Sequence, residues 1–227
     1  MSDASRFCLS ARRRIRGADA FRALAGVLFS CFVLASCSGG GERGALPPNP
    51  NVMALTDGKG ANKIINGEYA LTDYNGVPAT PDRFAGKITI IYFGFASCPD
   101  VCPLALGRLS AALNELGAAR LDEIAPLFIT VDPKRDTPEA LKAYLSFDDR
   151  IIGLTGDEAA SEAARQSFKV YASEEPMEGS ALGYTVDHSS LFYLIDRDGT
   201  PLYALQDTMT PTEIADVLKA ATAWPSS

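Results

Sequence analysis

The sequence predicts an α/β domain in which helices flank a central mixed sheet that a closing β-hairpin completes. Residues 87–95 (KITIIYFGF) are apolar on both faces, which is typical of a central strand covered by helices on both sides. Leucines recur at helical spacing directly afterwards, within residues 103–119. Strand-like and helix-like segments then alternate, which favours a mostly parallel sheet with antiparallel strands added by the last hairpin.

The expected strands are short apolar or β-branched segments bounded by turn residues. A strand at 67–73 leads into a turn at 73–76 (DYNG), and a turn at Asp198 and Gly199 joins the last two strands. The full set of expected strands is 67–73, 87–95, 125–133, 151–156 and the two halves of 189–205.

The expected helices begin at recognisable capping residues. Thr137 is the predicted N-cap of a helix over 136–147, with Pro138 at its first position. The segments 155–158 (TGDE) and 210–213 (TPTE) have the spacing of a capping box, and each predicts the start of a helix.

Residues 1–36 are expected to be a signal peptide rather than part of the fold. Arginines precede an apolar run of 14 residues, which is shorter than the roughly 20 residues that a membrane-spanning helix needs. The run ends in LASC, which resembles a bacterial lipoprotein signal and implies that Cys37 carries a lipid. Residues 37–61 are then a flexible tether to a domain over 62–227. An anchor helix and an ordinary secretory signal are the alternatives.

The charge of the exported part excludes one class of partner. Without residues 1–36 the chain carries 15 basic and 26 acidic side chains, a net charge of about −11. An acidic surface repels phosphate backbones, so we expect no nucleic acid as a partner. The chain has five cysteines, and only Cys98 and Cys102 remain in the exported domain once Cys37 is lipidated.

These two cysteines follow the central strand, in the order Cys-Pro-Asp-Val-Cys. The proline after each cysteine predicts that both sulfurs lie on a loop and that the helix begins at Pro103. The partial positive charge of a helix N-terminus stabilises a thiolate, the form that binds a metal or attacks a disulfide. A dithiol between a long strand and a helix is also typical of a thioredoxin-like fold. A redox pair, a structural disulfide and part of a metal site all remain open.

His188 is the only histidine in the chain, and it precedes an apolar strand. In a thioredoxin-like arrangement, the loop before the strand that opens the closing hairpin lies beside the dithiol. Cys98, Cys102 and His188 would then offer two thiolates and an imidazole, which suit Cu(I) or Zn(II). A structural zinc site takes four ligands, so three soft ligands favour Cu(I). A histidine that only packs or faces solvent is the alternative.

Several carboxylates lie close to these motifs in the sequence. Asp100 stands between the cysteines and is a candidate for tuning their charge or contacting a partner. Asp132 lies at the end of the second buried strand, where strand ends gather near the dithiol, and is a candidate for supporting the ligands or contacting a partner. Asp187 is a candidate for orienting the imidazole of the next residue. Asp136, which is followed by Thr-Pro, is expected mainly to form a turn. Turn formation or capping is the alternative for the others too.

Three motifs together resemble the Sco/SenC family of copper chaperones. They are GFASCPDVCPLAL (94–106), ITVDPKRDTPEALKAY (129–144) and VDHSSLFYLIDRDG (186–199). The resemblance implies a thioredoxin-like fold in which Cys98, Cys102 and His188 bind Cu(I) or Cu(II). Many members have Thr-His before the first motif cysteine, whereas this chain has Ala96 and Ser97. Because neither position supplies a ligand, the copper interpretation is unaffected, but partner specificity could differ.

The resemblance also implies a function and a location. The protein is expected to deliver copper to the copper A site in subunit II of cytochrome c oxidase, without enzymatic turnover. The alternative is a thiol-disulfide reductase that keeps the copper-site cysteines of the oxidase reduced, with Cys98 and Cys102 as its redox-active pair. A periplasmic copper donor or thiol reductase is a further expected partner. The lipid on Cys37 implies a place in the bacterial cell envelope, anchored to a membrane and facing the periplasm.

Overall fold

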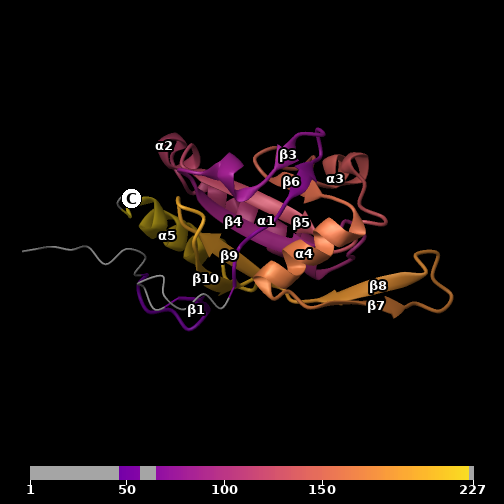
Figure 1. Cartoon of the computed structure of the whole chain (residues 1–227). Coiled ribbons are helices and arrows are strands. Elements are labelled where there is room, and N and C mark those ends of the chain that lie inside the picture. Colours follow the sequence, from indigo (N-terminus) through magenta and orange to yellow (C-terminus); the bar gives the residue numbers. More distant parts are fainter. Residues whose placement is uncertain (1–45, 57–64, 225–227) are drawn as a thin grey trace, which may run out of the picture. The chain divides into compact units, whose positions relative to one another are not determined.

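An eight-stranded mixed sheet forms the core of the residues that the structure describes, which are 46–56 and 65–224 (Figure 1). In this computed structural model all of them belong to one unit, Gly40–Ser227. The strand order is β1-β10-β9-β4-β5-β6-β2-β3. β4 pairs in parallel with β5, and β5 with β6, whereas β9 and β2 join this centre in the antiparallel sense. The predicted α/β class and mixed sheet are confirmed.

The two central strands are buried along their whole length, as their apolar sequences predict. The strands of the large sheet are β1 (Val52–Ala54), β2 (Leu71–Asp73), β3 (Pro78–Ala79), β4 (Ile88–Gly94), β5 (Ile124–Thr130), β6 (Ile152–Thr155), β9 (Leu191–Ile195) and β10 (Pro201–Gln206). A separate antiparallel pair consists of β7 (Ala172–Pro176) and β8 (Tyr184–His188).

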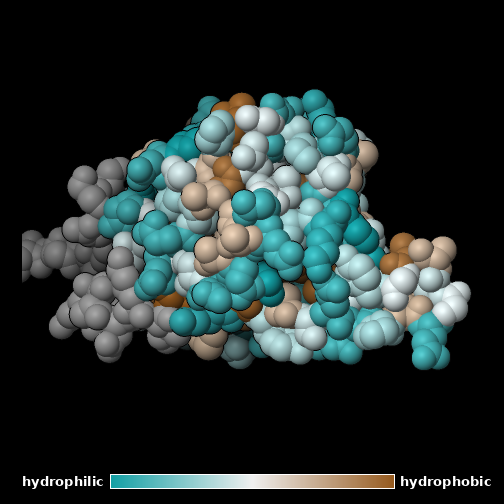
Figure 2. Space-filling model, turned by 45° about the vertical axis from the view of Figure 1, so that its right-hand side comes forward, coloured by the Kyte–Doolittle hydropathy of each residue, from teal (hydrophilic) through white to brown (hydrophobic). Residues whose placement is uncertain are grey.

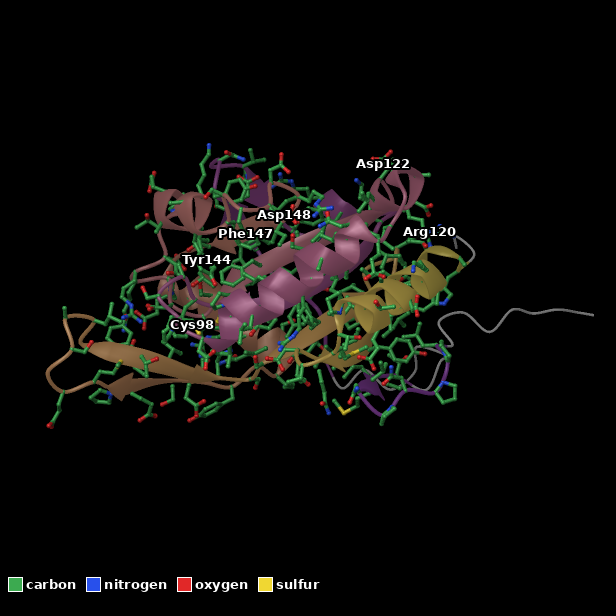
Figure 3. The ribbon with its side chains drawn as sticks, turned by 180° about the vertical axis from the view of Figure 1, so that it is seen from behind. Cys98, Arg120, Asp122, Tyr144, Phe147 and Asp148 are labelled. Carbon is green, nitrogen blue, oxygen red and sulfur yellow. The ribbon has the colours of Figure 1, made fainter. Side chains whose placement is uncertain are left out.

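Helices cover both faces of the large sheet. α1 and α5 lie side by side on one face, and α4 lies on the other (Figure 1 and Figure 3). The leucines of α1 that the periodicity singled out are buried against the sheet, and each contributes roughly 2 kcal/mol on transfer from water. The helices are α1 (Val101–Asn114), α2 (Ala118–Leu121), α3 (Pro138–Tyr144), α4 (Glu158–Phe168) and α5 (Pro211–Thr222), with a 3-10 turn at Pro81–Phe84.

The start of α1 differs from its prediction. The helix begins at Val101, so Cys102 lies in its first turn, and the prediction that both sulfurs lie on a loop is wrong for Cys102. Pro103 is compatible with this start because the first N–H groups of a helix have no partner within the helix. Cys102 is therefore held by helical backbone, whereas Cys98 lies in the loop before it.

Of the two predicted capping boxes, one is confirmed and the other is not. The capping box of α5 is confirmed, with Thr210 and Glu213 each bonding the other's backbone N–H. The TGDE spacing placed the cap of α4 at Thr155, but Asp157 caps that helix and accepts from the N–H of Ala160 at 2.7 Å. Thr155 instead donates its hydroxyl to a buried carbonyl.

Two strand features were not predicted. β1 lies within the segment expected to be a tether, pairs with β10 and is an edge strand of the large sheet. β7 and β8, with the loop that joins them, form a hairpin over residues 172–188 that extends away from the large sheet (Figure 1). We call it the β7–β8 arm. Figure 2 shows the arm projecting at the right, with hydrophobic side chains among its polar ones; Met177 and Leu182 are exposed there.

The N-terminal predictions fall outside the described residues. Residues 1–45 include the expected signal peptide and Cys37, and residues 57–64 include the expected domain boundary at 62. The signal, the lipid and this boundary therefore stay predictions. Among residues 46–56 and 65–224, no helix has both the length and the apolar character needed to cross a membrane.

Candidate metal centre

The two cysteines lie where β4 ends and α1 begins. β4 ends at Gly94, and the next residues carry Cys98 on a short loop and Cys102 in the first helical turn. Cys98 retains 9% exposure, whereas Cys102 is fully buried. Figure 3 shows Cys98 at the start of α1, near the base of the β7–β8 arm. One sulfur is thus positioned at the surface and the other beneath it.

Hydrogen bonds give the two thiols different acidities. The Cys98 sulfur accepts from the backbone N–H of Cys102 at 3.5 Å, and both cysteines are free thiols. The hydrogen bond from the Cys102 thiol lowers the pKa of Cys98, with further help from the backbone at Asp100 and Cys102. The same bond and burial raise the pKa of Cys102. In the reduced protein, Cys98 is therefore the thiolate and Cys102 the donor.

His188 is brought to the dithiol by the end of β8. Its Nε2 lies 3.6 Å from the sulfur of Cys102. Its Nδ1 lies 3.0 Å from the carbonyl oxygen of Ser189, which can only accept, so Nδ1 carries the proton and Nε2 presents its lone pair to the sulfur. The rings of Phe95 and Tyr92 lie beside the imidazole and nearly perpendicular to it. The only histidine thus faces the dithiol, as expected.

This donor set fits a soft metal ion. A tetrahedral ion with bonds of ~2.3 Å to sulfur and ~2.0 Å to nitrogen separates its two ligand atoms by about 3.5 Å. The 3.6 Å between Cys102 and His188 is close to that separation. Over the described ranges, no three Cys, His, Asp or Glu side chains already form a closed metal cluster. Cys98, the more exposed thiol, lies within hydrogen-bonding reach of Cys102 and is the third donor.

The carboxylate of Asp136 supports the loop that carries Cys98, a role that its sequence context did not predict. Its carboxylate accepts from the backbone N–H of Ala96 at 3.0 Å and from the hydroxyl of Thr130 at 2.6 Å. The side chain is almost fully buried, and burial raises its pKa to about 6. Asp136 therefore ties the loop that carries Cys98 to the end of β5. This role was not predicted because the Thr-Pro that follows Asp136 indicated a turn.

The three other carboxylates occupy different places. Asp132 is buried and bonds Arg135 and the hydroxyl of Tyr184, the latter at 2.8 Å, so it contacts the β7–β8 arm. Asp100 is exposed at the N-cap of α1 without a side-chain capping bond. Asp187 was predicted to orient the imidazole of His188, but it is exposed, and Nδ1 of His188 bonds the Ser189 carbonyl instead.

A chain of hydroxyl groups fixes the segment after His188. The hydroxyl of Tyr92 donates to Ser190 at 2.7 Å, and Ser190 donates to the carboxylate of Asp207 at 2.7 Å. Because Tyr92 belongs to the central strand, this chain connects the backbone just beyond His188 to the core. No sequence pattern indicates it, because the three residues are far apart in the chain.

Sequence comparisons place this arrangement among known proteins. A profile of the SCO1/SenC family matches residues 57–223. The chain is 41% identical over 159 residues to an SCO2-like protein of Rickettsia felis, covering 70% of this chain and 77% of that one. It is 46% identical over 142 residues to the mitochondrial protein SCO2 of Saccharomyces cerevisiae, covering 62% of this chain and 47% of that one.

Solved structures show the same fold. Copper-bound ScoI of Bradyrhizobium japonicum is 42% identical with a TM-score of 0.64, over 69% of this chain and 99% of that one. Copper-bound yeast Sco1 is 37% identical with a TM-score of 0.64, over 72% and 91%. A third structure is that of BsSco, described as a member of the Sco family of cytochrome c oxidase assembly proteins in which a disulfide switch was identified. It is 25% identical with a TM-score of 0.54, over 70% and 94%.

Proposed function

The chain belongs to the SCO1/SenC family, and from this premise we propose that it is a copper metallochaperone that binds copper through Cys98, Cys102 and His188. The observation that carries the proposal is the 3.6 Å contact between the Cys102 sulfur and Nε2 of His188. This contact joins segments 86 residues apart in the sequence and brings the only imidazole to the dithiol. Two thiolates and one imidazole form a soft donor set that suits Cu(I).

The relatives support the choice of metal. ScoI of Bradyrhizobium japonicum and yeast Sco1 share this fold and were both solved with copper bound. Zinc is the competing ion for thiolate and imidazole ligands, but a closed structural zinc site takes four protein ligands. The three donors proposed here leave such a site one ligand short.

We further propose that the copper goes to the copper A site in subunit II of cytochrome c oxidase. BsSco is described as a member of a family of cytochrome c oxidase assembly proteins, which supports this target. Transfer would proceed by ligand exchange, in which an acceptor thiolate or imidazole replaces one donor of this site at a time and copper keeps its oxidation state. A lipid on Cys37 would hold the domain at a membrane facing the periplasm, where a periplasmic copper donor could load it.

A second function is favoured by the acidity of Cys98. Because its pKa is lowered, Cys98 is the nucleophile expected of a thiol-disulfide reductase. The Cys98 thiolate would attack a disulfide between the copper-site cysteines of the oxidase, and Cys102 would then resolve the mixed disulfide. The acceptor leaves as a dithiol and this protein as a disulfide, which a periplasmic thiol reductase would have to reduce again.

An anaerobic Cu(I) titration tests the metal site. The reduced protein is titrated against a competing Cu(I) chelator, beside His188→Ala and the matched control Asp187→Ala, which changes the exposed neighbour on the other face of β8. We expect one-to-one binding, a loss of at least about tenfold in affinity for His188→Ala, and no change for the control. Equal affinity in His188→Ala and the unmodified protein would refute the three-ligand site. Unchanged disulfide exchange in the same variant would show that the reductase chemistry does not need His188.

A further inference from the structure

The face of β8 that carries His188 points toward the body of the domain. Side chains alternate along a strand, so Tyr184, Val186 and His188 share one face. Val186 is buried on this face, whereas Asp187 on the opposite face is exposed. In the ladder with β7, His188 pairs with Ala172 at one end, and Tyr184 lies at the other. The position of the imidazole therefore depends on how this strand is held.

Arg135 holds the Tyr184 end of that face. Its Nη1 donates to the carbonyl oxygens of Tyr184 at 2.9 Å and Leu182 at 3.2 Å. Its guanidinium carbon also lies 3.7 Å from the centre of the Tyr184 ring. A stacked cation contact and two hydrogen bonds thus fall on one short segment of the arm.

A third residue closes this contact into a ring. Asp132 accepts from Nε of Arg135 and, through its other oxygen, from the Tyr184 hydroxyl at 2.8 Å. Only 3% of Asp132 is exposed, and its backbone N–H donates to the hydroxyl of Thr130 at the end of β5. The ring of Arg135, Asp132 and Tyr184 is therefore anchored in the large sheet, and we call it the arm latch.

The neighbouring ion pair cannot replace the arm latch. Lys134 lies 2.7 Å from Glu174 on β7, but both side chains are half exposed. Such pairs contribute about 0–1 kcal/mol because water and salt screen them. Lys134 therefore serves as the matched control for Arg135, since it is a cation on the same loop that also contacts the arm.

We propose that Arg135 is a positioning residue, which keeps His188 beside Cys102 by latching the β7–β8 arm to the loop after β5. The inference rests on the proposed function, in which His188 is a metal ligand. Arg135 acts through the strand: it fixes Tyr184, and the five residues of β8, Tyr184–His188, transmit that position. The planar guanidinium of Arg135 is required, because it both stacks on the Tyr184 ring and donates several hydrogen bonds in fixed directions, whereas a lysine would supply only a point charge.

The first test needs no metal. Amide hydrogen exchange is measured along the strand Tyr184–His188 in the metal-free protein, in Arg135→Gln and in the control Lys134→Gln. Arg135→Gln is expected to speed exchange in this strand while the exchange of β4 and β5 stays unchanged, and the control is expected to change neither. Tyr184→Phe, which removes one hydroxyl and keeps the ring, is a milder variant expected to act in the same direction. Unchanged exchange in both latch variants would overturn the proposal.

The second test asks whether Arg135 acts through His188. Cu(I) affinity is measured for Arg135→Gln, His188→Ala and the double variant. We expect Arg135→Gln to lose about 10- to 100-fold in affinity, as residues that orient metal ligands do, and to cause no further loss once His188 is absent. Additive losses would overturn the positioning role. If the unmodified protein binds no Cu(I), the proposed function fails, whereas the exchange experiment still decides whether the latch exists.

Discussion

Replacing Asp136 by asparagine tests how the cysteine loop is supported. The carboxylate is 1% exposed and accepts hydrogen bonds from Ala96 and Thr130. An asparagine side chain has nearly the same shape, and its carbonyl oxygen can accept both bonds. The substitution therefore removes the buried charge while preserving these two bonds, so the pH-dependent part of its effect on stability measures the charge.

The magnitude follows from the acidity of the group. Burial raises the pKa of Asp136 to about 6, with Asp132 adding to the rise, whereas Thr130, the N–H of Ala96 and Arg135 oppose it. Relative to the ordinary value of about 3.9, this corresponds to about 3 kcal/mol. The folded protein is less stable by that amount with Asp136 charged than with it protonated, because the unfolded chain solvates the charge freely.

The sign of the pH dependence follows. Between about pH 4 and 6 the folded protein holds a proton on Asp136 that the unfolded chain has released. The contribution of Asp136 to stability therefore falls as the pH rises through this window, and it is constant above it. The asparagine side chain of the variant does not titrate. The free energy of unfolding of the variant minus that of the unmodified protein should rise by up to about 3 kcal/mol from pH 4 to 7.

Urea unfolding under reducing conditions measures this difference. Both proteins share Cys98 and every other titrating group, so those contributions cancel when the two profiles are subtracted. Asp136→Ala is the contrasting variant, because it leaves the Ala96 N–H and the Thr130 hydroxyl without an acceptor at about 1–3 kcal/mol each at any pH. If Asp136→Asn shifted stability by the same amount at pH 4 and pH 7, the buried charge would not be the cause.

Two further predictions concern the dithiol. In Gly94→Ala, the new methyl group would lie 2.9 Å from the Phe128 ring and 3.0 Å from the Cys102 sulfur. We therefore expect the free energy of unfolding in urea to fall by about 1–3 kcal/mol and Cu(I) binding to weaken. Unchanged values for both would contradict the tight packing. For Cys98, the pH midpoint of alkylation should lie well below the ordinary thiol pKa of about 8.5, and it should return toward that value in Cys102→Ala. An ordinary midpoint in the unmodified protein would contradict the hydrogen bond between the thiols.

The predictable parts of the fold are those where burial imposes a pattern. β4 and β5 are covered on both faces, so nearly every residue is apolar, and the leucines of α1 recur because one side of that helix meets the sheet. The capping box of α5 was equally clear because both of its side chains act locally. Cys98, Cys102 and His188 were identified from residue type and position in the expected topology.

The features that escaped prediction lack such a pattern. Most of β7 is exposed, so its sequence ASEEP shows no alternation, and a loop separates it from its partner strand. Arg135 and Asp136 stand side by side in a segment that looks like an ordinary turn before a helix. One bonds the β7–β8 arm and the other bonds the cysteine loop, and both partners are about 40 residues or more away. Only the folded chain brings these groups together.

The location of the site follows from the direction of three strands. β4 and β5 are parallel, so the cysteine loop after Gly94 and the loop that carries Asp132 leave from the same edge of the sheet. β9 runs antiparallel to β4 and pairs Phe192 with Tyr92, which places the start of β9 at that edge. His188 precedes this start by a few residues and is delivered to the dithiol. Had β9 been parallel, His188 would lie at the opposite edge, so the closing hairpin is what completes the donor set.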